Sequence, residues 1–168
     1  MIECPPLSIR FTLNGSEQSI EVEPSAVLVD ILREKFGLTG TKITCDQAVC
    51  GACTVLLDGR PTASCSEFAF MVEGRSVTTI EGLGSPETLH PLQAAFIETG
   101  ALQCGFCTPG MILLLDALLR QNPDPDEDAL RQWLSSSVCR CTGYQVIIDA
   151  VLLAAARYRS ETRPDARS

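Results

Sequence analysis

The chain begins with apolar and polar residues that alternate on both sides of a turn signal. Before the turn, apolar side chains stand at every second position, at Ile9, Phe11 and Leu13. Alternation of this kind predicts strands with one buried face. The dipeptide Asn14-Gly15 between two such strands predicts a tight hairpin. We therefore expect the chain to open with a β-hairpin.

A helical period follows the hairpin directly. Apolar residues now recur three and four positions apart, at Val27, Leu28, Ile31, Leu32 and Phe36. This spacing predicts a helix, and Gly37 is suited to end it. From residue 39 to residue 53 the period vanishes and glycine and cysteine become frequent, so a functional loop is expected there.

Shorter strand patterns complete the first half of the chain. Residues 54–64 have the pattern of strand, turn and strand around Asp58-Gly59, and residues 75–83 contain one more short strand. Together with the hairpin and the helix, these segments predict a small mixed sheet crossed by one helix. We assign residues 1–82 to this first domain.

The second half has helical rather than strand patterns. A linker with proline and glycine is expected at residues 83–90, followed by four helices within residues 91–158. Gly100 is placed to end the first of these helices and Pro109 to begin the second. The fold class expected for the chain is therefore α+β, with a C-terminal four-helix bundle domain and a polar tail at residues 159–168.

The charge of the chain excludes two kinds of partner. Asp and Glu number 21 against 13 Lys and Arg, which gives a formal net charge of −8. Nucleic acids and anionic membrane surfaces attract basic proteins, so neither is expected to bind this chain. No apolar run reaches the roughly 20 residues that span a bilayer, and no secretory signal is visible, so a cytoplasmic location is expected. Hydrophobic residues make up 45%, which favours either a very apolar helical core or a surface covered by a partner.

Cysteine is the most informative residue type in the composition. The chain has nine cysteines, and in a reducing compartment such a number indicates metal ligation rather than disulfides. Cys4 stands apart from the others and is expected to be a spectator. The one histidine, His90, lies in the linker, where a solvent-exposed or helix-capping role is expected rather than catalysis with a cysteine.

The first cysteine group has the spacing C-x4-C-x2-C. It consists of Cys45, Cys50, Cys53 and the more distant Cys65. This run is typical of plant-type ferredoxins, which hold a [2Fe–2S] cluster. One loop must wrap around such a cluster, so Gly51 is expected to adopt a positive φ. Backbone N–H groups of the loop are expected to donate to sulfur.

The second cysteine group combines a C-x2-C pair with a C-x-C pair. It consists of Cys104, Cys107, Cys139 and Cys141, and each pair precedes an expected helix. If the two helix starts lie together, the four thiolates meet at one end of the bundle. Helix N-termini favour negative charge, so this placement suits an anionic cluster.

The residue pattern alone leaves other classes of protein open. Structural zinc also takes four cysteines, although its pairs are more often separated by two to four residues. A zinc-bound interaction module and a free-standing electron carrier therefore stand beside an electron-transfer subunit. In either redox interpretation the electrons come from and go to other proteins, because the chain carries no further cofactor motif.

Three stretches also carry a family resemblance. They are CDQAVCGACTVLLDG, ALQCGFCTPGM and CRCTGY, in that order. With them the chain resembles the iron–sulfur small subunit of molybdenum hydroxylases. That family includes xanthine dehydrogenase, aldehyde oxidoreductase, carbon monoxide dehydrogenase and quinoline 2-oxidoreductase. The resemblance runs from residue 7 to residue 158 and departs from the family pattern at no ligand position.

The resemblance implies a fold and a set of ligands. It implies a plant-type ferredoxin-like β-grasp domain before the linker and a four-helix domain after it, with one [2Fe–2S] cluster in each. Gln103 and Cys141 are implied to lie beside a molybdenum pterin of the partner subunit. The implied cluster ligands are Cys45, Cys50, Cys53, Cys65, Cys104, Cys107, Cys139 and Cys141.

The resemblance also implies an assembly. The chain would be the electron-transfer subunit of an oxidoreductase, without a substrate site of its own. A large subunit would hold the molybdenum pterin and a medium subunit FAD, in a dimer of heterotrimers. Electrons would pass from molybdenum through the two clusters to FAD. The large subunit is expected to hydroxylate an aromatic N-heterocycle (quinoline-like) or an aldehyde, with a carbon monoxide dehydrogenase or xanthine dehydrogenase type of complex as the alternative.

Overall fold

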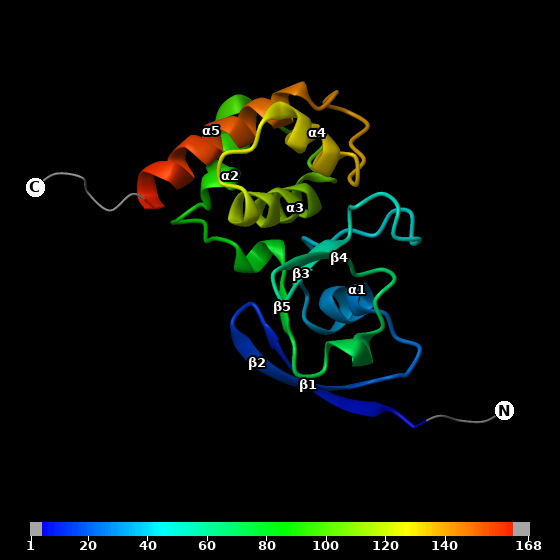
Figure 1. Cartoon of the computed structure of the whole chain (residues 1–168). Coiled ribbons are helices and arrows are strands. Elements are labelled where there is room, and N and C mark those ends of the chain that lie inside the picture. The colour runs from blue at the N-terminus through cyan, green and yellow to red at the C-terminus, as the bar shows by residue number, and fades with distance from the viewer. Residues whose placement is uncertain (1–4, 163–168) are drawn as a thin grey trace, which may run out of the picture.

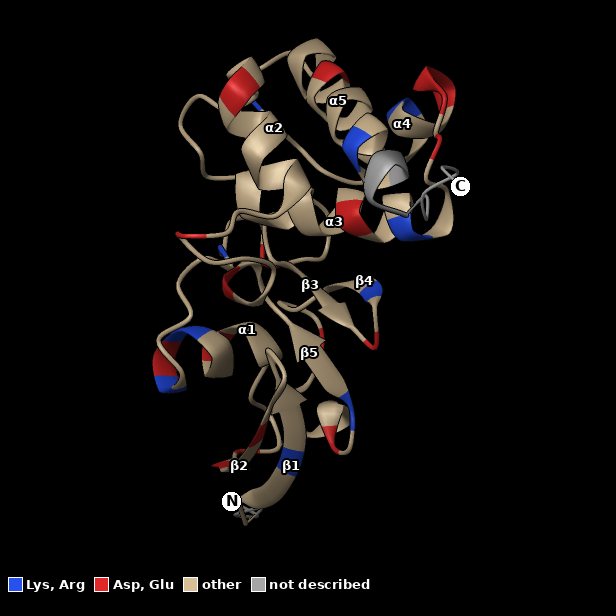
Figure 2. Ribbon diagram, turned by 90° about the vertical axis from the view of Figure 1, so that its left-hand side faces the viewer, with Lys and Arg blue, Asp and Glu red and all other residues tan. Residues whose placement is uncertain are grey.

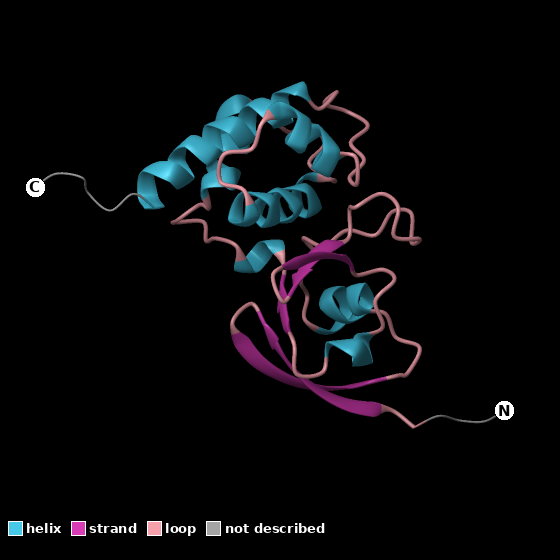
Figure 3. Ribbon diagram, in the orientation of Figure 1, coloured by secondary structure: helices cyan, strands magenta, loops and turns pink. Residues whose placement is uncertain are grey.

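The structure, a computed structural model, separates the sheet from most of the helices (Figures 1 and 3). It describes residues 5–162, with side chains through residue 158. Within these residues the chain forms one five-stranded sheet and five α-helices, so the expected mixture of α and β structure is present. No helix of the described part is long and apolar enough to cross a membrane.

The predicted hairpin opens the described part of the chain. Its strands, Leu7–Leu13 (β1) and Ser16–Val22 (β2), pair antiparallel, and Leu13 lies opposite Ser16 across the turn. Asn14 and Gly15 both have positive φ, 49° and 81°, as a tight hairpin turn requires. The alternating pattern therefore predicted the strand pairing correctly, and Asn14-Gly15 predicted the turn.

Three further strands complete the sheet. They are Thr54–Leu57 (β3), Arg60–Ala63 (β4) and Ser76–Thr78 (β5). The strand order is β2-β1-β5-β3-β4, with β1 and β5 parallel and the other neighbours antiparallel. All four residues of β3 are buried, because the sheet core covers one face of the strand and the helical half packs against the other.

The helix predicted after the hairpin is present but is not a regular α-helix. A short α-helix at Leu28–Asp30 (α1) continues as a π-helix at Ile31–Lys35, whose last bond joins the N–H of Phe36 to the carbonyl of Ile31. After this turn, the Phe36 ring lies edge-on to Phe11 of the sheet, with centroids 5.9 Å apart. The apolar spacing predicted the buried face, but an i to i+5 pattern has no signal in it.

Four helices form the second half. They are Pro91–Thr99 (α2), Thr108–Gln121 (α3), Glu127–Leu134 (α4) and Gln145–Thr162 (α5). The predicted signals act where expected, since Gly100 has φ of 66° after α2 and Pro109 lies in the first turn of α3. α5 extends through residues 159–162, which were expected to belong to the polar tail. The rest of that tail, residues 163–168, lies outside the described residues.

His90 and a buried carboxylate tie three of these helices together. His90 caps α2 by accepting the N–H of Leu92, which confirms the capping role. Asp116 of α3 is fully buried and accepts hydrogen bonds from Tyr158 of α5 at 2.9 Å and from Arg120 at 2.8 Å. Burial alone would raise the pKa of Asp116, but its bonds with His90, Arg120 and Tyr158 outweigh burial and lower it.

The two halves meet through a small apolar contact. Leu56 of β3 packs with Leu113 and Ala117 of α3. Next to this contact, α3 approaches the first cysteine loop so closely that a Cβ on Gly110 would lie 2.4 Å from the carbonyl oxygen of Gly51. The first cysteine loop therefore packs against the start of α3, the helix that follows the C-x2-C pair.

Candidate metal centres

The first cysteine loop curls back on itself before β3. Its backbone has positive φ at Asp46, Ala48 and Gly51, with values of 56°, 55° and 72°. This region is uncommon for residues with a Cβ and natural for glycine, so the expected positive φ of Gly51 is confirmed. The curl turns successive N–H groups of the loop toward the cysteine sulfurs.

Backbone N–H groups of this loop donate to sulfur, as expected. The N–H groups of Val49 and Cys50 each lie 3.4 Å from the Sγ of Cys45, and the N–H of Ala48 lies 3.4 Å from the Sγ of Cys65. Backbone N–H bonds from the loop lower the pKa of Cys45 to about 6. These bonds stabilise the thiolate, which is the form that binds metals.

The four thiols of the first group lie in two pairs. Cys45 contacts the side chain of Cys50, and Cys53 contacts the side chain of Cys65. Cys53 and Cys65 are buried beside Val29, and burial raises the pKa of Cys53 to about 11. One pair therefore lies nearer solvent and the other inside the fold.

The second group also forms two pairs, each with one cysteine from either loop. The Sγ atoms of Cys104 and Cys141 lie 3.6 Å apart, and both residues are exposed. Cys107 and Cys139 contact each other and are half-buried, and burial raises the pKa of Cys107 to about 12. The structure thus brings the C-x2-C pair and the C-x-C pair of the sequence together, as the argument from the two helix starts predicted.

A mostly apolar cavity of about 200 Å³ lies among the second group. All four thiols of the group line it, and Cys50 and Ala52 of the first loop form another part of its wall. None of the eight cysteines forms a disulfide. Among residues 5–162, no three His, Cys, Asp or Glu side chains are arranged to hold a single metal ion. Four thiols in two pairs are the donor set that a two-iron cluster takes, so the residues present fit this group.

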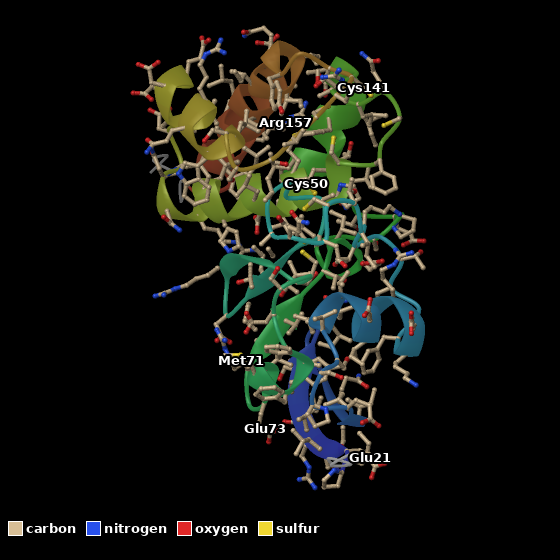
Figure 4. All side chains as sticks on the ribbon, turned by 90° about the vertical axis from the view of Figure 1, so that its right-hand side faces the viewer. Glu21, Cys50, Met71, Glu73, Cys141 and Arg157 are labelled. Atoms are coloured by element: carbon tan, nitrogen blue, oxygen red, sulfur yellow. The ribbon has the colours of Figure 1, made fainter. Side chains whose placement is uncertain are left out.

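The two cysteine loops touch each other directly. The N–H of Val138 donates to the carbonyl oxygen of Cys50 at 2.9 Å. A Cβ on Gly51 would lie 2.8 Å from the carbonyl oxygen of Ser136, so only glycine fits at this crossing. Figure 4 shows Cys50 where the two halves meet and Cys141 farther out on the helical half. The two cysteine groups are therefore neighbours, and the hydrogen bond from Val138, the residue before Cys139, to Cys50 joins them.

Gln103 bridges the two segments of the second group. Its Nε2 donates to the carbonyl oxygen of Cys141 at 3.0 Å, and the residue is exposed. The predicted position beside a partner's pterin stays a prediction. Cys4 lies outside the described residues.

Two residues that the sequence did not single out support the C-x-C pair. The hydroxyl of Thr142 lies 3.1 Å from the Sγ of Cys139. The Tyr144 Oη accepts the N–H of Cys139 at 2.8 Å and donates to the carbonyl of Ser137 at 3.0 Å. Burial would raise the pKa of Cys139, but the bonds from Thr142 and its other neighbours outweigh burial and lower it. The only signal in the sequence is that both residues follow the pair directly, in CRCTGY.

Comparison with known proteins agrees with the two groups. Residues 11–77 match the family model of a 2Fe-2S iron-sulfur cluster binding domain, and residues 79–152 match that of a [2Fe-2S] binding domain. One match therefore contains the whole first group and the other the whole second group.

The chain is similar to a whole small subunit of one oxidoreductase and to one part of a longer oxidoreductase. The chain is 44% identical over 151 residues to the nicotinate dehydrogenase small FeS subunit of Eubacterium barkeri. The aligned residues cover 90% of this chain and 96% of that protein. It is 47% identical over 148 residues to an aldehyde oxidoreductase of Megalodesulfovibrio gigas, covering 86% of this chain but 16% of that much longer protein.

A solved structure agrees over nearly the whole chain. It is the quinoline 2-oxidoreductase from Pseudomonas putida 86, matched with a TM-score of 0.89 and 46% identity over 94% of this chain and 98% of that one. Identity and coverage at this level extend from the sheet to the last helix. The chain belongs to the family of iron–sulfur small subunits of molybdenum hydroxylases.

Proposed function

We propose that this chain carries electrons from a molybdenum pterin on a large partner subunit, through two [2Fe–2S] clusters, to FAD on a medium subunit. A bound [2Fe–2S] cluster supplies one-electron transfer. The observation that carries the proposal is that two four-thiol groups face each other across a single backbone hydrogen bond, from Val138 to Cys50. A chain with two such groups in contact is suited to conduct electrons rather than to bind a substrate.

The eight paired cysteines are the proposed ligands, four for each cluster. The contacts within each pair and the N–H bonds to sulfur support this assignment. We also propose the finer fold description, a ferredoxin-like β-grasp domain at residues 1–82, a linker at 83–90 and a four-helix domain that begins at residue 91 and ends with α5. Its support is that each half has its own apolar core.

The structure favours a definite route between the two clusters. Val138, whose N–H bonds to the carbonyl of Cys50, directly precedes Cys139. The backbone thus connects a proposed ligand of the first cluster to one of the second through one hydrogen bond. Leu56 and Leu113 pack nearby and exclude water from the contact between the halves.

The exposed side of the second group is proposed to face the molybdenum pterin. Cys104 and Cys141 are exposed there, and Gln103 holds the two segments together through its bond to the Cys141 carbonyl. We propose that Gln103 and Cys141 contact the pterin of the large subunit.

Exposed apolar side chains in both halves of the molecule support the proposal that partner subunits cover part of its surface. Val49, Ile97 and Val138 are 66%, 62% and 52% exposed. Charged residues are spread over both halves rather than gathered in one region (Figure 2). Such a surface suits protein partners better than charged ligands. We propose a dimer of heterotrimers, located in the cytoplasm.

The substrate is proposed to be an aromatic N-heterocycle or an aldehyde, bound by the large subunit. Relatives carry names that fit both classes, among them quinoline 2-oxidoreductase, nicotine 6-hydroxylase small subunit and aldehyde oxidoreductase. A complex of the carbon monoxide dehydrogenase or xanthine dehydrogenase type is the alternative. The sequence of the large chain that copurifies would decide between them.

Purification of the native protein tests the proposal. We expect a red-brown complex with about four irons and about four acid-labile sulfides per chain, as two [2Fe–2S] clusters require. A colourless protein with zinc in place of iron would overturn the cluster assignment. An isolated, redox-active species of 18.1 kDa in size-exclusion chromatography would overturn the subunit role.

A further inference from the structure

Thr142 directly follows the C-x-C pair and makes two contacts with one sulfur. Its Oγ1 lies 3.1 Å from the Sγ of Cys139 and its backbone N lies 3.4 Å from the same atom. Both distances are within the range of hydrogen bonds to sulfur. The side chain of Thr142 is therefore aimed at one particular thiol of the second group.

The local backbone sets the direction of the Thr142 hydroxyl. The N–H of Tyr144 points at the Thr142 Oγ1 from 3.4 Å, so this oxygen accepts there and its own proton is free to donate to sulfur. Tyr144 holds this position because its Oη binds both Cys139 N and Ser137 O. The Thr142 hydroxyl is thus preorganised toward the Cys139 sulfur, and no rearrangement is needed for it to donate there.

The hydroxyl bond distinguishes Cys139 from its neighbours in the group. Cys104 and Cys141 are exposed, so water can solvate their sulfurs, whereas Cys139 and Cys107 are half-buried. A hydrogen bond in a sheltered position acts more strongly than one in water. Hydrogen bonds to the sulfurs and solvent exposure are among the factors that set the potential of an iron–sulfur cluster.

We propose that Thr142 is a positioning residue whose hydroxyl bond to the Cys139 sulfur raises the reduction potential of the second cluster. The inference rests on the proposed function, in which Cys139 is a ligand of that cluster. Reduction adds one electron, supplied by the molybdenum-containing partner, and moves no proton. The added negative charge is shared by the thiolates, so a hydrogen bond donated to one of them favours the reduced state. The second cluster thereby becomes the better acceptor for the partner's electron.

The test is a redox titration of the purified complex, followed by EPR, with Thr142→Val and Thr142→Ser. Valine has the shape of threonine without the hydroxyl, whereas serine keeps the hydroxyl. We expect Thr142→Val to shift the reduction equilibrium of the second cluster about tenfold toward the oxidised state, which for a one-electron couple is about 59 mV lower. Thr142→Ser is expected to titrate like the wild type.

Two controls separate a local effect from a general one. The first cluster, titrated in the same samples, should keep its potential in both variants. Thr99→Val is the matched control, because the Thr99 hydroxyl bonds the carbonyl of Ala95 on α2 and touches no cysteine. It should leave both clusters unchanged.

Three results would overturn the inference. They are an unchanged potential in Thr142→Val, an equal shift in Thr142→Ser, and loss of the second cluster in Thr142→Val, which would make the residue necessary for assembly rather than for tuning. In each case the wild-type complex still shows two cluster signals. A wild-type complex without two cluster signals would instead overturn the proposed function.

Discussion

The thiols of this protein differ from one another because each sulfur has its own surroundings. Loop N–H groups lower the pKa of Cys45 to about 6, whereas burial raises the pKa of Cys53 to about 11 and that of Cys107 to about 12. Without a cation nearby, the thiols of Cys53 and Cys107 therefore keep their protons at neutral pH. Metal ligation requires the thiolate, so binding of the proposed clusters would release these protons and supply the compensating positive charge.

Single substitutions should separate the two proposed clusters. Cys50→Ser and Cys107→Ser each remove one thiolate from a different group. We expect each variant to lose one EPR signal of the reduced complex and to keep the other, with about half of the iron, because the groups share no ligand.

The serine variants also have a clear contrary outcome. If one substitution removed both signals while far-UV circular dichroism showed an intact fold, the assignment of two independent groups would be wrong. Ser135→Ala is a suitable control, because this serine is exposed and its hydroxyl donates to the carbonyl of Gln132 at the end of its own helix.

At the scale of elements, the first cysteine loop packs closely against α3. Gly110 lies in the first turn of α3, where its Cα faces the carbonyl of Gly51. Leu113 continues the contact one turn later by packing on Leu56 of β3. α3 therefore carries Cys107 at its start and also supports the loop that carries Cys50.

Gly110→Ala tests this close approach, because it should lower the stability of the protein, whereas the same change in most helices raises it. In an ordinary helix, alanine in place of glycine stabilises by roughly 1 kcal/mol. Here the new Cβ would lie 2.4 Å from a backbone oxygen, so the loop must shift. We expect a loss of about 1–3 kcal/mol, which is typical of overpacking, measured by denaturant unfolding. A more stable variant with unchanged EPR spectra would contradict the packing.

In the molecule as a whole, the chain places two cysteine loops on the same side of two differently built halves. The loops before β3 and before α5 both extend to the right in Figure 1. The contacts among His90, Asp116 and Tyr158 anchor the end of the linker to the helical half, and Leu56 packs the sheet against α3. The two exposed cysteines, Cys104 and Cys141, lie on the helical half and the two buried ones, Cys53 and Cys65, in the sheet half, which agrees with the proposed direction of the route.

Gln103→Ala should affect electron entry more than stability. Its side chain is exposed and its amide bonds the carbonyl of Cys141. Loss of one hydrogen bond of about 0.5–1.5 kcal/mol should slow transfer from molybdenum to the second cluster by roughly threefold to tenfold, seen by rapid-reaction kinetics of the complex. The free energy of unfolding should fall by about 0.5 kcal/mol, the low end of that range, because the bond is exposed to water.

A matched glutamine controls for this substitution. Gln132→Ala changes an exposed glutamine on α4, away from the cysteines, and should leave the transfer rate unchanged. Equal rates in the wild type and in Gln103→Ala would remove Gln103 from the proposed contact with the pterin.

Local patterns in the sequence predicted most of the elements, because their signals lie within a few residues. The hairpin, the end of α2 at Gly100 and the start of α3 at Pro109 follow from turn and capping preferences that act on neighbours. The π-helix at Ile31–Lys35 and the length of α5 were not predicted. The spacing of apolar residues carries no signal for an i to i+5 pattern or for a helical turn made of polar residues.

Covalent spacing alone keeps the cysteines of each short run close together, in C-x4-C-x2-C, in C-x2-C and in C-x-C, and this is what the sequence could predict. Only the tertiary structure decided how the thiols pair, because Cys104 meets Cys141 across a distance in the chain that no local rule spans. It also decided that the two groups touch, through Val138 and Cys50. That contact lies beside the close packing of α3 against the first loop, and packing between distant segments is a property of the whole fold.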